Sequence, residues 1–162
     1  MTADRQELEM AYQKYGATVL RRAVRLLGSD EAAWEAVHQV FLSLLERPEQ
    51  FQKRSSMLTF LYEATTHHCL NQLRNHKTRM RLLETKAHPE GGSAGLGPDE
   101  FVALRQRLAQ LPRELGEVAV YFHLDQMSYD EIAETTGHSR RKVALLLSRL
   151  KTHEREEAKH ED

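Results

Sequence analysis

The chain contains a single cysteine, Cys69, among its 162 residues. One thiol excludes an internal disulfide, a zinc site built on several thiolates and a redox-active cysteine pair, and it suits a protein of the reducing cytoplasm. Nine histidines are present, including the adjacent pair His67 and His68, but none follows the His-Glu-x-x-His spacing of a zinc-binding helix. The sequence therefore predicts no metal site.

Long apolar runs and a strong charge bias are also missing. No stretch approaches the roughly 18 apolar residues that cross a bilayer, and the opening MTADRQELEM carries acids where a secretory signal is basic. We therefore expect neither membrane insertion nor export. The net charge is −1, whereas a dedicated nucleic-acid-binding domain often has a clear basic excess. Any contact with nucleic acid must come from local basic patches.

Patterns that carry catalysis are missing as well. The scattered Ser, Cys and His residues form no recognisable pairing of a nucleophile with a base. The glycines of residues 91–97 follow no predicted strand and precede no Gly-Lys-Ser or Gly-Lys-Thr, which argues against a phosphate-binding loop. We therefore expect a protein that is not an enzyme and that uses no cofactor.

Leucine and alanine dominate the apolar residues, and this composition favours helix throughout. Apolar side chains recur at steps of three and four over residues 8–27 and 33–45, which predicts two amphipathic helices joined tightly at Gly28-Ser29-Asp30. Gly16 weakens the first helix and could split it. A third helix over residues 58–73 runs into a basic segment. The fold class predicted is all-α.

Residues 87–99, AHPEGGSAGLGPD, contain four glycines and two prolines without any apolar periodicity. Such a segment has little reason to bury itself, so we predict a flexible linker there. The chain then divides into two small helical domains, residues 1–86 and residues 100–162. In the second, a short helix from Phe101 ends before Pro112, and another helix spans residues 118–124.

The second domain contains the pattern of a helix-turn-helix. Ser128 and Glu131 form a capping-box signature at the start of one helix, and Gly137 permits the turn that follows it. Ser139 can cap the next helix, whose inward face carries Val143, Leu146, Leu147 and Leu150. This spacing of small, turn-forming and apolar residues is typical of helix-turn-helix motifs.

The second helix of this motif begins with polar and basic residues that can bind DNA: Ser139, Arg140, Arg141, Lys142 and, further along, Arg149. The alternative is a solvated cationic face on a helical hairpin that docks protein. Leu145 points about 160° away from Leu147 on an ideal helix, beside Ala144. We therefore expect Ala144 and Leu145 to serve protein docking, with weak and poorly sequence-selective contact to DNA.

Two segments resemble a known family. Residues 111–153, LPRELGEVAVYFHLDQMSYDEIAETTGHSRRKVALLLSRLKTH, resemble the C-terminal domain of extracytoplasmic-function sigma factors of bacterial RNA polymerase. Residues 12–77 are similar to the N-terminal domain through YQKYGATVLRRAVRLLGSDEAAWEAVHQVFLSLL and FLYEATTHHCLNQLRNHK. The two matches stand in the family's order, with the linker between them.

The resemblance implies a division of labour with core RNA polymerase and promoter DNA as partners. The second helix would bind the polymerase clamp through Glu35, His38, Gln39 and Leu42. The third helix would hold the opened downstream (minus-10) promoter element through His67, Asn71, Arg74 and Lys77. The helix-turn-helix would read the upstream (minus-35) element and pack on a polymerase flap. An anti-sigma factor could be a further partner.

Several residues depart from the family's pattern. Glu35, His38 and Gln39 stand where an Asp, a Gln and an acid are usual, and residues 65–67 (Thr-Thr-His) replace Ala-Arg-Asn. The alternative function is therefore a sigma-like regulator or scaffold that has lost part of its promoter-reading surface. Trp34 and Phe41 could anchor a partner, although an amphipathic helix more often buries such side chains in the core.

Overall fold

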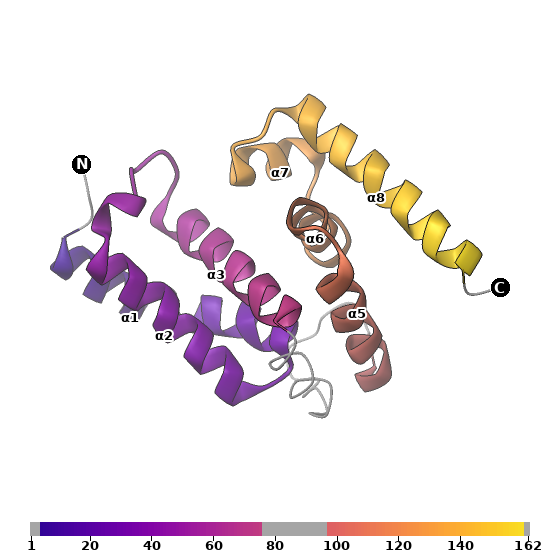
Figure 1. Cartoon of the computed structure of the whole chain (residues 1–162). Coiled ribbons are helices and arrows are strands. Elements are labelled where there is room, and N and C mark those ends of the chain that lie inside the picture. Colours follow the sequence, from indigo (N-terminus) through magenta and orange to yellow (C-terminus); the bar gives the residue numbers. More distant parts are fainter. Residues whose placement is uncertain (1–3, 76–96, 161–162) are drawn as a thin grey trace. The chain divides into compact units, whose positions relative to one another are not determined.

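The computed structural model describes residues 4–75 and 97–160, and every regular element in these two ranges is helical (Figure 1). The expected all-α fold class is confirmed. Contacts divide the chain into two compact units, Met1–Gln110 and Leu111–Asp162. No helix of the described ranges combines the length and the apolar character that a bilayer crossing requires.

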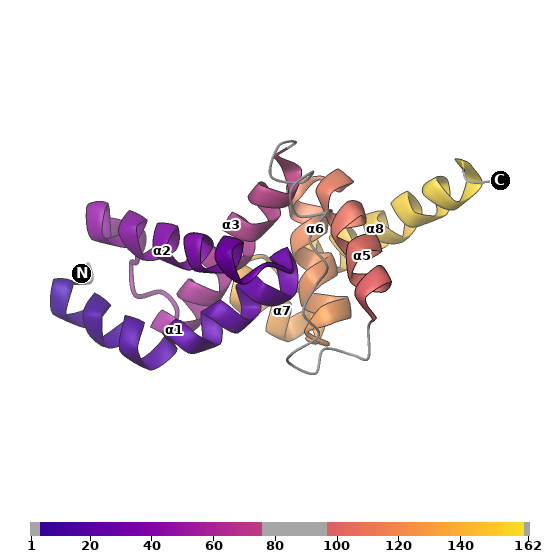
Figure 2. The ribbon, with the colours of Figure 1, turned by 90° about the horizontal axis from the view of Figure 1, so that it is seen from below.

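The first unit is built on a helical hairpin of α1 (Arg5–Leu27) and α2 (Asp30–Glu46), on which α3 (Met57–Arg74) packs (Figure 2). The hairpin turn depends on Gly28, which has φ 71° and so adopts a left-handed conformation that side chains disfavour. Ser29 then caps α2 by accepting a hydrogen bond from the Ala32 amide at 3.2 Å. A short 3-10 turn, Pro48–Gln50, follows α2.

Helix α1 passes through Gly16 without a break, so the expectation that this glycine could split it is wrong. A glycine inside a helix costs only about 1 kcal/mol relative to alanine. Buried residues on both sides, from Leu8 and Ala11 to Val19 and Ala23, hold the helix against its neighbours. Tertiary packing therefore outweighs the local weakness.

Most of the core of this unit comes from the apolar stripes expected from the sequence, although Tyr12 and Leu45 of these stripes are exposed. The buried side chains include Leu26 and Leu27 of α1, Val37, Val40, Phe41 and Leu44 of α2, and Leu61, Leu70 and Leu73 of α3. Cys69 is also buried, and burial raises the pKa of its thiol to about 12. This cysteine is a core residue without thiolate chemistry.

Helix α5 (Pro98–Gln110) also belongs to the first unit, where it packs against α3. Its first residues, Pro98 and Asp99, were expected in the linker; proline suits the first turn of a helix because its missing N–H has no partner there. Most of the expected linker, residues 87–96, lies outside the described ranges. The guanidinium of Arg105 is buried against Gly28, and burial lowers its pKa.

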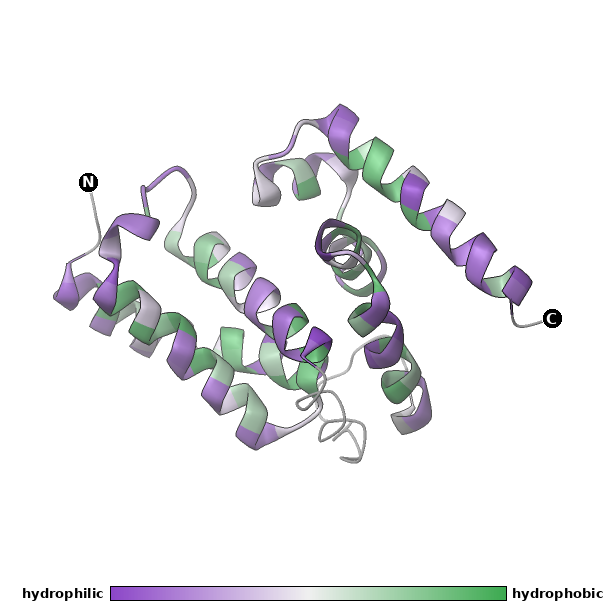
Figure 3. Ribbon diagram, viewed as in Figure 1, coloured by the Kyte–Doolittle hydropathy of each residue, from purple (hydrophilic) through white to green (hydrophobic). Residues whose placement is uncertain are grey.

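The second unit comprises α6 (Arg113–Ala119), a π-helical turn (Val120–Leu124), α7 (Tyr129–Thr136) and α8 (Arg140–His160). The helix expected over residues 118–124 thus begins earlier, directly after Pro112. In Figure 3 the hydrophobic colour on α8 is concentrated in its first half, and its last turns are hydrophilic. The first half of α8 therefore contributes its side chains to the core of this unit, together with residues of α6, the π-helical turn and α7.

Candidate polymerase and nucleic-acid interfaces

The turn of the helix-turn-helix is shaped by local hydrogen bonds. Ser128 and Glu131 form a reciprocal capping box at the start of α7, with both bonds at 3.1 Å. Gly137 ends α7 with φ 77°, and its amide donates to the Ala133 carbonyl at 2.9 Å. Ser139 accepts from the Lys142 amide at 3.1 Å and so caps α8 as expected.

Helix α8 has one buried face and one exposed face. Val143, Leu146, Leu147 and Leu150 are buried, which confirms the predicted inward stripe. Leu145 is 50% exposed and Ala144 beside it is also exposed, so both point away from the core as expected. An exposed apolar pair on this face cannot supply hydrogen bonds to base edges.

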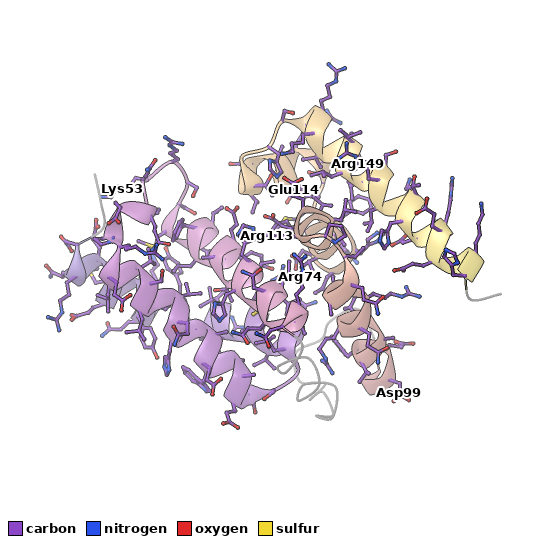
Figure 4. The ribbon with its side chains drawn as sticks, in the orientation of Figure 1. Lys53, Arg74, Asp99, Arg113, Glu114 and Arg149 are labelled. Atoms are coloured by element: carbon purple, nitrogen blue, oxygen red, sulfur yellow. The ribbon has the colours of Figure 1, made fainter. Side chains whose placement is uncertain are left out.

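The predicted cations all lie on the exposed surface of α8, and Figure 4 shows Arg149 partway along the helix. Two of them form ion pairs across helices: Arg140 Nε lies 3.5 Å from Asp130 Oδ1, and Lys142 Nζ lies 3.2 Å from Glu114 Oε1. The sequence does not indicate these acids, because each acid and its partner lie in different helices and no spacing along the chain links them.

The exposed face of α2 contains all four residues predicted to bind polymerase, namely Glu35, His38, Gln39 and Leu42. The opposite face is buried in the core. The sequence therefore assigned these four exposed residues, and Val37, Val40, Phe41 and Leu44 on the buried face, correctly.

Two further apolar side chains lie exposed on α2. Trp34 is 44% exposed and stacks against His38 at 5.5 Å between ring centroids. The expectation that Trp34 belongs to the core is wrong, whereas Phe41 is buried as expected. Leu45 is 49% exposed, although it was included in the apolar pattern. The spacing of Trp34, His38, Leu42 and Leu45, at steps of four, four and three, could have indicated this second stripe.

A groove of about 310 Å³ runs between α2 and α3. Its polar lining comes from Glu35 and Gln39 of α2 and from His68 and Gln72 of α3. His68 Nε2 lies 3.4 Å from Gln72 Nε2. Burial lowers the pKa of His68. No sequence pattern indicates a role for His68 or Gln72, because only the packing of α3 on α2 brings them beside Glu35.

On α3, three of the four residues predicted to bind the downstream promoter element, His67, Asn71 and Arg74, recur at steps of four and three, so they share one helix face. Asn71 and Arg74 are exposed, and Figure 4 shows Arg74 at the end of the helix. His67 is half-buried and lies 3.9 Å from Glu63 of the same helix. Lys77, the fourth predicted residue, lies outside the described residues.

The geometry of α7, its turn and α8, together with the cations at the start of α8, defines the second unit as a helix-turn-helix domain, a class of module that binds DNA. The family model for Sigma-70 region 4 matches residues 101–153, and the model for Sigma-70 region 2 matches residues 11–79. A curated relative, RNA polymerase sigma factor YlaC of Bacillus subtilis (strain 168), is 25% identical over 154 residues, covering 91% of this chain and 89% of the relative.

The chain therefore belongs to the sigma-70 family, as a sigma factor of the extracytoplasmic-function group. A sigma factor acts with core RNA polymerase and promoter DNA and directs transcription initiation. The members of this family are transcription factors rather than enzymes.

Proposed function

We propose that this sigma factor works in the cytoplasm and divides its activity among three surfaces. The exposed face of α2 binds the polymerase clamp, the outer face of α3 holds the opened minus-10 element, and the start of α8 binds the minus-35 element. In sequence, the corresponding domains are residues 1–86 and residues 100–162 with residues 87–99 between them, although α5 (Pro98–Gln110) packs in the first compact unit. The observation that best supports this division is the second, exposed stripe of α2.

The α2 stripe has the composition of a protein-binding surface. Three apolar side chains, Trp34, Leu42 and Leu45, lie exposed on a helix whose other face already fills the core. Exposed tryptophan is enriched among the residues that contribute most to protein interfaces. Glu35 and Gln39 flank the apolar residues and supply the polar rim that interfaces usually carry.

Charge reversal on this face tests the polymerase assignment. Glu35→Lys combined with Gln39→Lys should weaken the affinity for purified core polymerase about tenfold or more, because a single like-charge contact at an interface can cost several kcal/mol. The control is Glu9→Lys with Gln13→Lys, which makes the same charge change at the same spacing on the exposed surface of α1. Unchanged affinity of the α2 variant would show that another surface binds the clamp.

The assignment of α3 to the opened promoter rests on exposed Asn71 and Arg74 near the basic end of the helix. Arg74→Ala should lower run-off transcription from the promoter upstream of the protein's own gene. A template whose minus-10 region is already unpaired should restore much of the activity, because its strands stay apart without the stabilisation that Arg74 contributes. Arg21→Ala, which removes an exposed arginine of α1, is the control. Failure of the unpaired template to restore transcription would point to a defect other than melting.

A second candidate function follows from the exposure of Leu145 and Ala144: the chain could act as a sigma-like regulator or scaffold that docks protein through α8. Leu145→Lys should then strengthen DNA binding through an added phosphate contact and weaken the protein partner. Loss of promoter recognition would instead show that Leu145 reads a base. Binding of core polymerase without run-off transcription would favour the regulator.

An anti-sigma factor is a further proposed partner. A small membrane protein with a cytoplasmic helical domain, encoded beside this chain, would be the candidate to test. Co-purification of that cytoplasmic domain with this chain, in competition with core polymerase, should detect it. If core polymerase still binds this chain in the presence of a saturating amount of that cytoplasmic domain, the proposal is wrong.

A further inference from the structure

The start of α8 carries fewer free positive charges than its sequence suggests. Glu114 of α6 pairs with Lys142 at 3.2 Å, and Asp130 of α7 pairs with Arg140 at 3.5 Å. The contact between Lys142 and Glu114 is a charge-assisted hydrogen bond, in which the Lys142 ammonium donates to Glu114 Oε1. Arg141 forms no ion pair within residues 111–160. All four side chains of the two ion pairs are exposed to solvent.

The two carboxylates have a common position in the fold. Each lies in the first turn of its own helix, and each reaches across to the beginning of α8. Among the four proposed DNA-binding cations, which are Arg140, Arg141, Lys142 and Arg149, the two acids halve the formal positive charge. Both acids thus lie where the phosphates of a docked duplex would need to approach.

We propose that Glu114 and Asp130 compete with DNA phosphates for Lys142 and Arg140, and so set a low intrinsic affinity of α8 for DNA. This inference rests on the proposed role of α8 in binding the promoter. When a phosphate arrives, each cation exchanges its carboxylate partner for the phosphate, and the carboxylate is left beside the DNA backbone as a repelling charge. Exposed ion pairs are weak enough for this exchange, so the acids tune binding without blocking it.

A structural role for the same pairs predicts the opposite result. If the pairs mainly hold α6 and α7 against α8, their removal should loosen the helix-turn-helix and weaken DNA binding. Competition predicts that removal of a carboxylate strengthens DNA binding, by about two- to fivefold for each pair. It also predicts a steeper salt dependence, by about one unit in the slope of log K against log salt for each freed cation.

The experiment measures the affinity of the full chain for a labelled DNA duplex of arbitrary sequence over a series of salt concentrations. The variants are Glu114→Gln and Asp130→Asn, singly and together. Glu156→Gln is the matched control, because it removes the same charge from an exposed residue of α8 about 21 Å along the helix from Lys142. Thermal unfolding by circular dichroism establishes that each variant is folded.

We expect both single variants to bind more tightly with steeper salt dependence, and Glu156→Gln to bind like the wild type. The gain from Glu114→Gln should become smaller in a Lys142→Gln background, because no cation is then freed and only the repulsion between the carboxylate and the DNA backbone is removed. Equal or weaker binding by the variants, or the same gain in Glu156→Gln, would overturn the proposal.

Arg141→Ala distinguishes a failure of the competition proposal from a failure of the proposed DNA-binding role of α8. If Arg141→Ala weakens DNA binding while Glu114→Gln and Asp130→Asn change nothing, only the competition is wrong. If Arg141→Ala also leaves the affinity unchanged, α8 is not the DNA-binding surface and both proposals are wrong.

Discussion

The buried arginine Arg22 connects α1 to α3, the helix that we propose to face the opened promoter. Its side chain is 2% exposed, and its Nε donates a hydrogen bond to Thr66 Oγ1 at 3.1 Å. The guanidinium carbon lies 4.5 Å from the centre of the Tyr62 ring, in a cation–π contact. The Thr66 hydroxyl in turn donates to the Tyr62 carbonyl at 2.8 Å. Arg22 is therefore a positioning residue for α3.

Arg22→Ala should lower the free energy of unfolding of the first unit by about 3 kcal/mol. Alanine leaves a cavity where the long buried side chain packed, and large-to-small substitutions in a core cost about 2 to 5 kcal/mol. The lost cation–π contact and hydrogen bond are largely offset, because the desolvated charge is removed with them. Arg22→Met keeps most of the side-chain volume and removes the buried charge. Replacing a buried charge by a packed apolar group often costs little, so we expect a loss of no more than about 1 kcal/mol.

Urea unfolding followed by the fluorescence of Trp34 measures this quantity, because Trp34 is the only tryptophan and lies in the first unit. The control is Arg21→Ala, which removes an exposed arginine that bonds only weakly to Thr18, at 3.4 Å. A loss in Arg22→Ala within about 0.5 kcal/mol of the control, the usual range of surface substitutions, would refute the reasoning. Equal losses in Arg22→Ala and Arg22→Met would show that the charge itself, not packing, is needed.

Three further predictions concern single side chains. Cys69 should resist thiol reagents at pH 8 until the protein unfolds, because burial raises its pKa to about 12; labelling of the native protein would contradict this. Burial lowers the pKa of His68 below its usual 6.5, so the unfolded chain binds the extra proton first as the pH falls. Stability should be full above pH 6.5 and decline below it, and His68→Gln should flatten this dependence in pH-dependent urea unfolding. Gln126 has φ 55°, so Gln126→Gly should relieve about 1 to 2 kcal/mol of backbone strain. This gain exceeds the chain entropy that glycine loses on folding, about 0.5 to 1 kcal/mol, so the melting temperature should rise. An unchanged or lower melting temperature would refute this strain.

Much of the architecture follows from local rules that a sequence displays. The caps at Ser29, Ser128 and Ser139 and the left-handed glycines Gly28 and Gly137 are short-range devices, so their residues predict where helices begin and end. The inward stripe of α8 follows in the same way from the helical period. The family resemblance then supplied the order of the domains and their shared function.

Local patterns predicted burial less well where a helix carries more apolar residues than its buried face can hold. Trp34 and Leu45 fit the general apolar pattern of α2, yet the core lies on the side of Val37 and Leu44, and only packing shows this. Gly16 was judged by its intrinsic propensity, whereas buried neighbours on both sides decide that α1 continues.

The sequence by itself determined the helical class, the two domain signatures, the helix-turn-helix and the cations that open α8. Each of these depends on spacing within one segment, where the helical period and hydrogen bonding act over a few residues. Only the tertiary structure decided that Glu114 and Asp130 neutralise two of those cations, and that Arg22 binds Thr66 across two helices. These contacts join residues far apart in the chain, and their distance depends on how the helices pack, which no local pattern records.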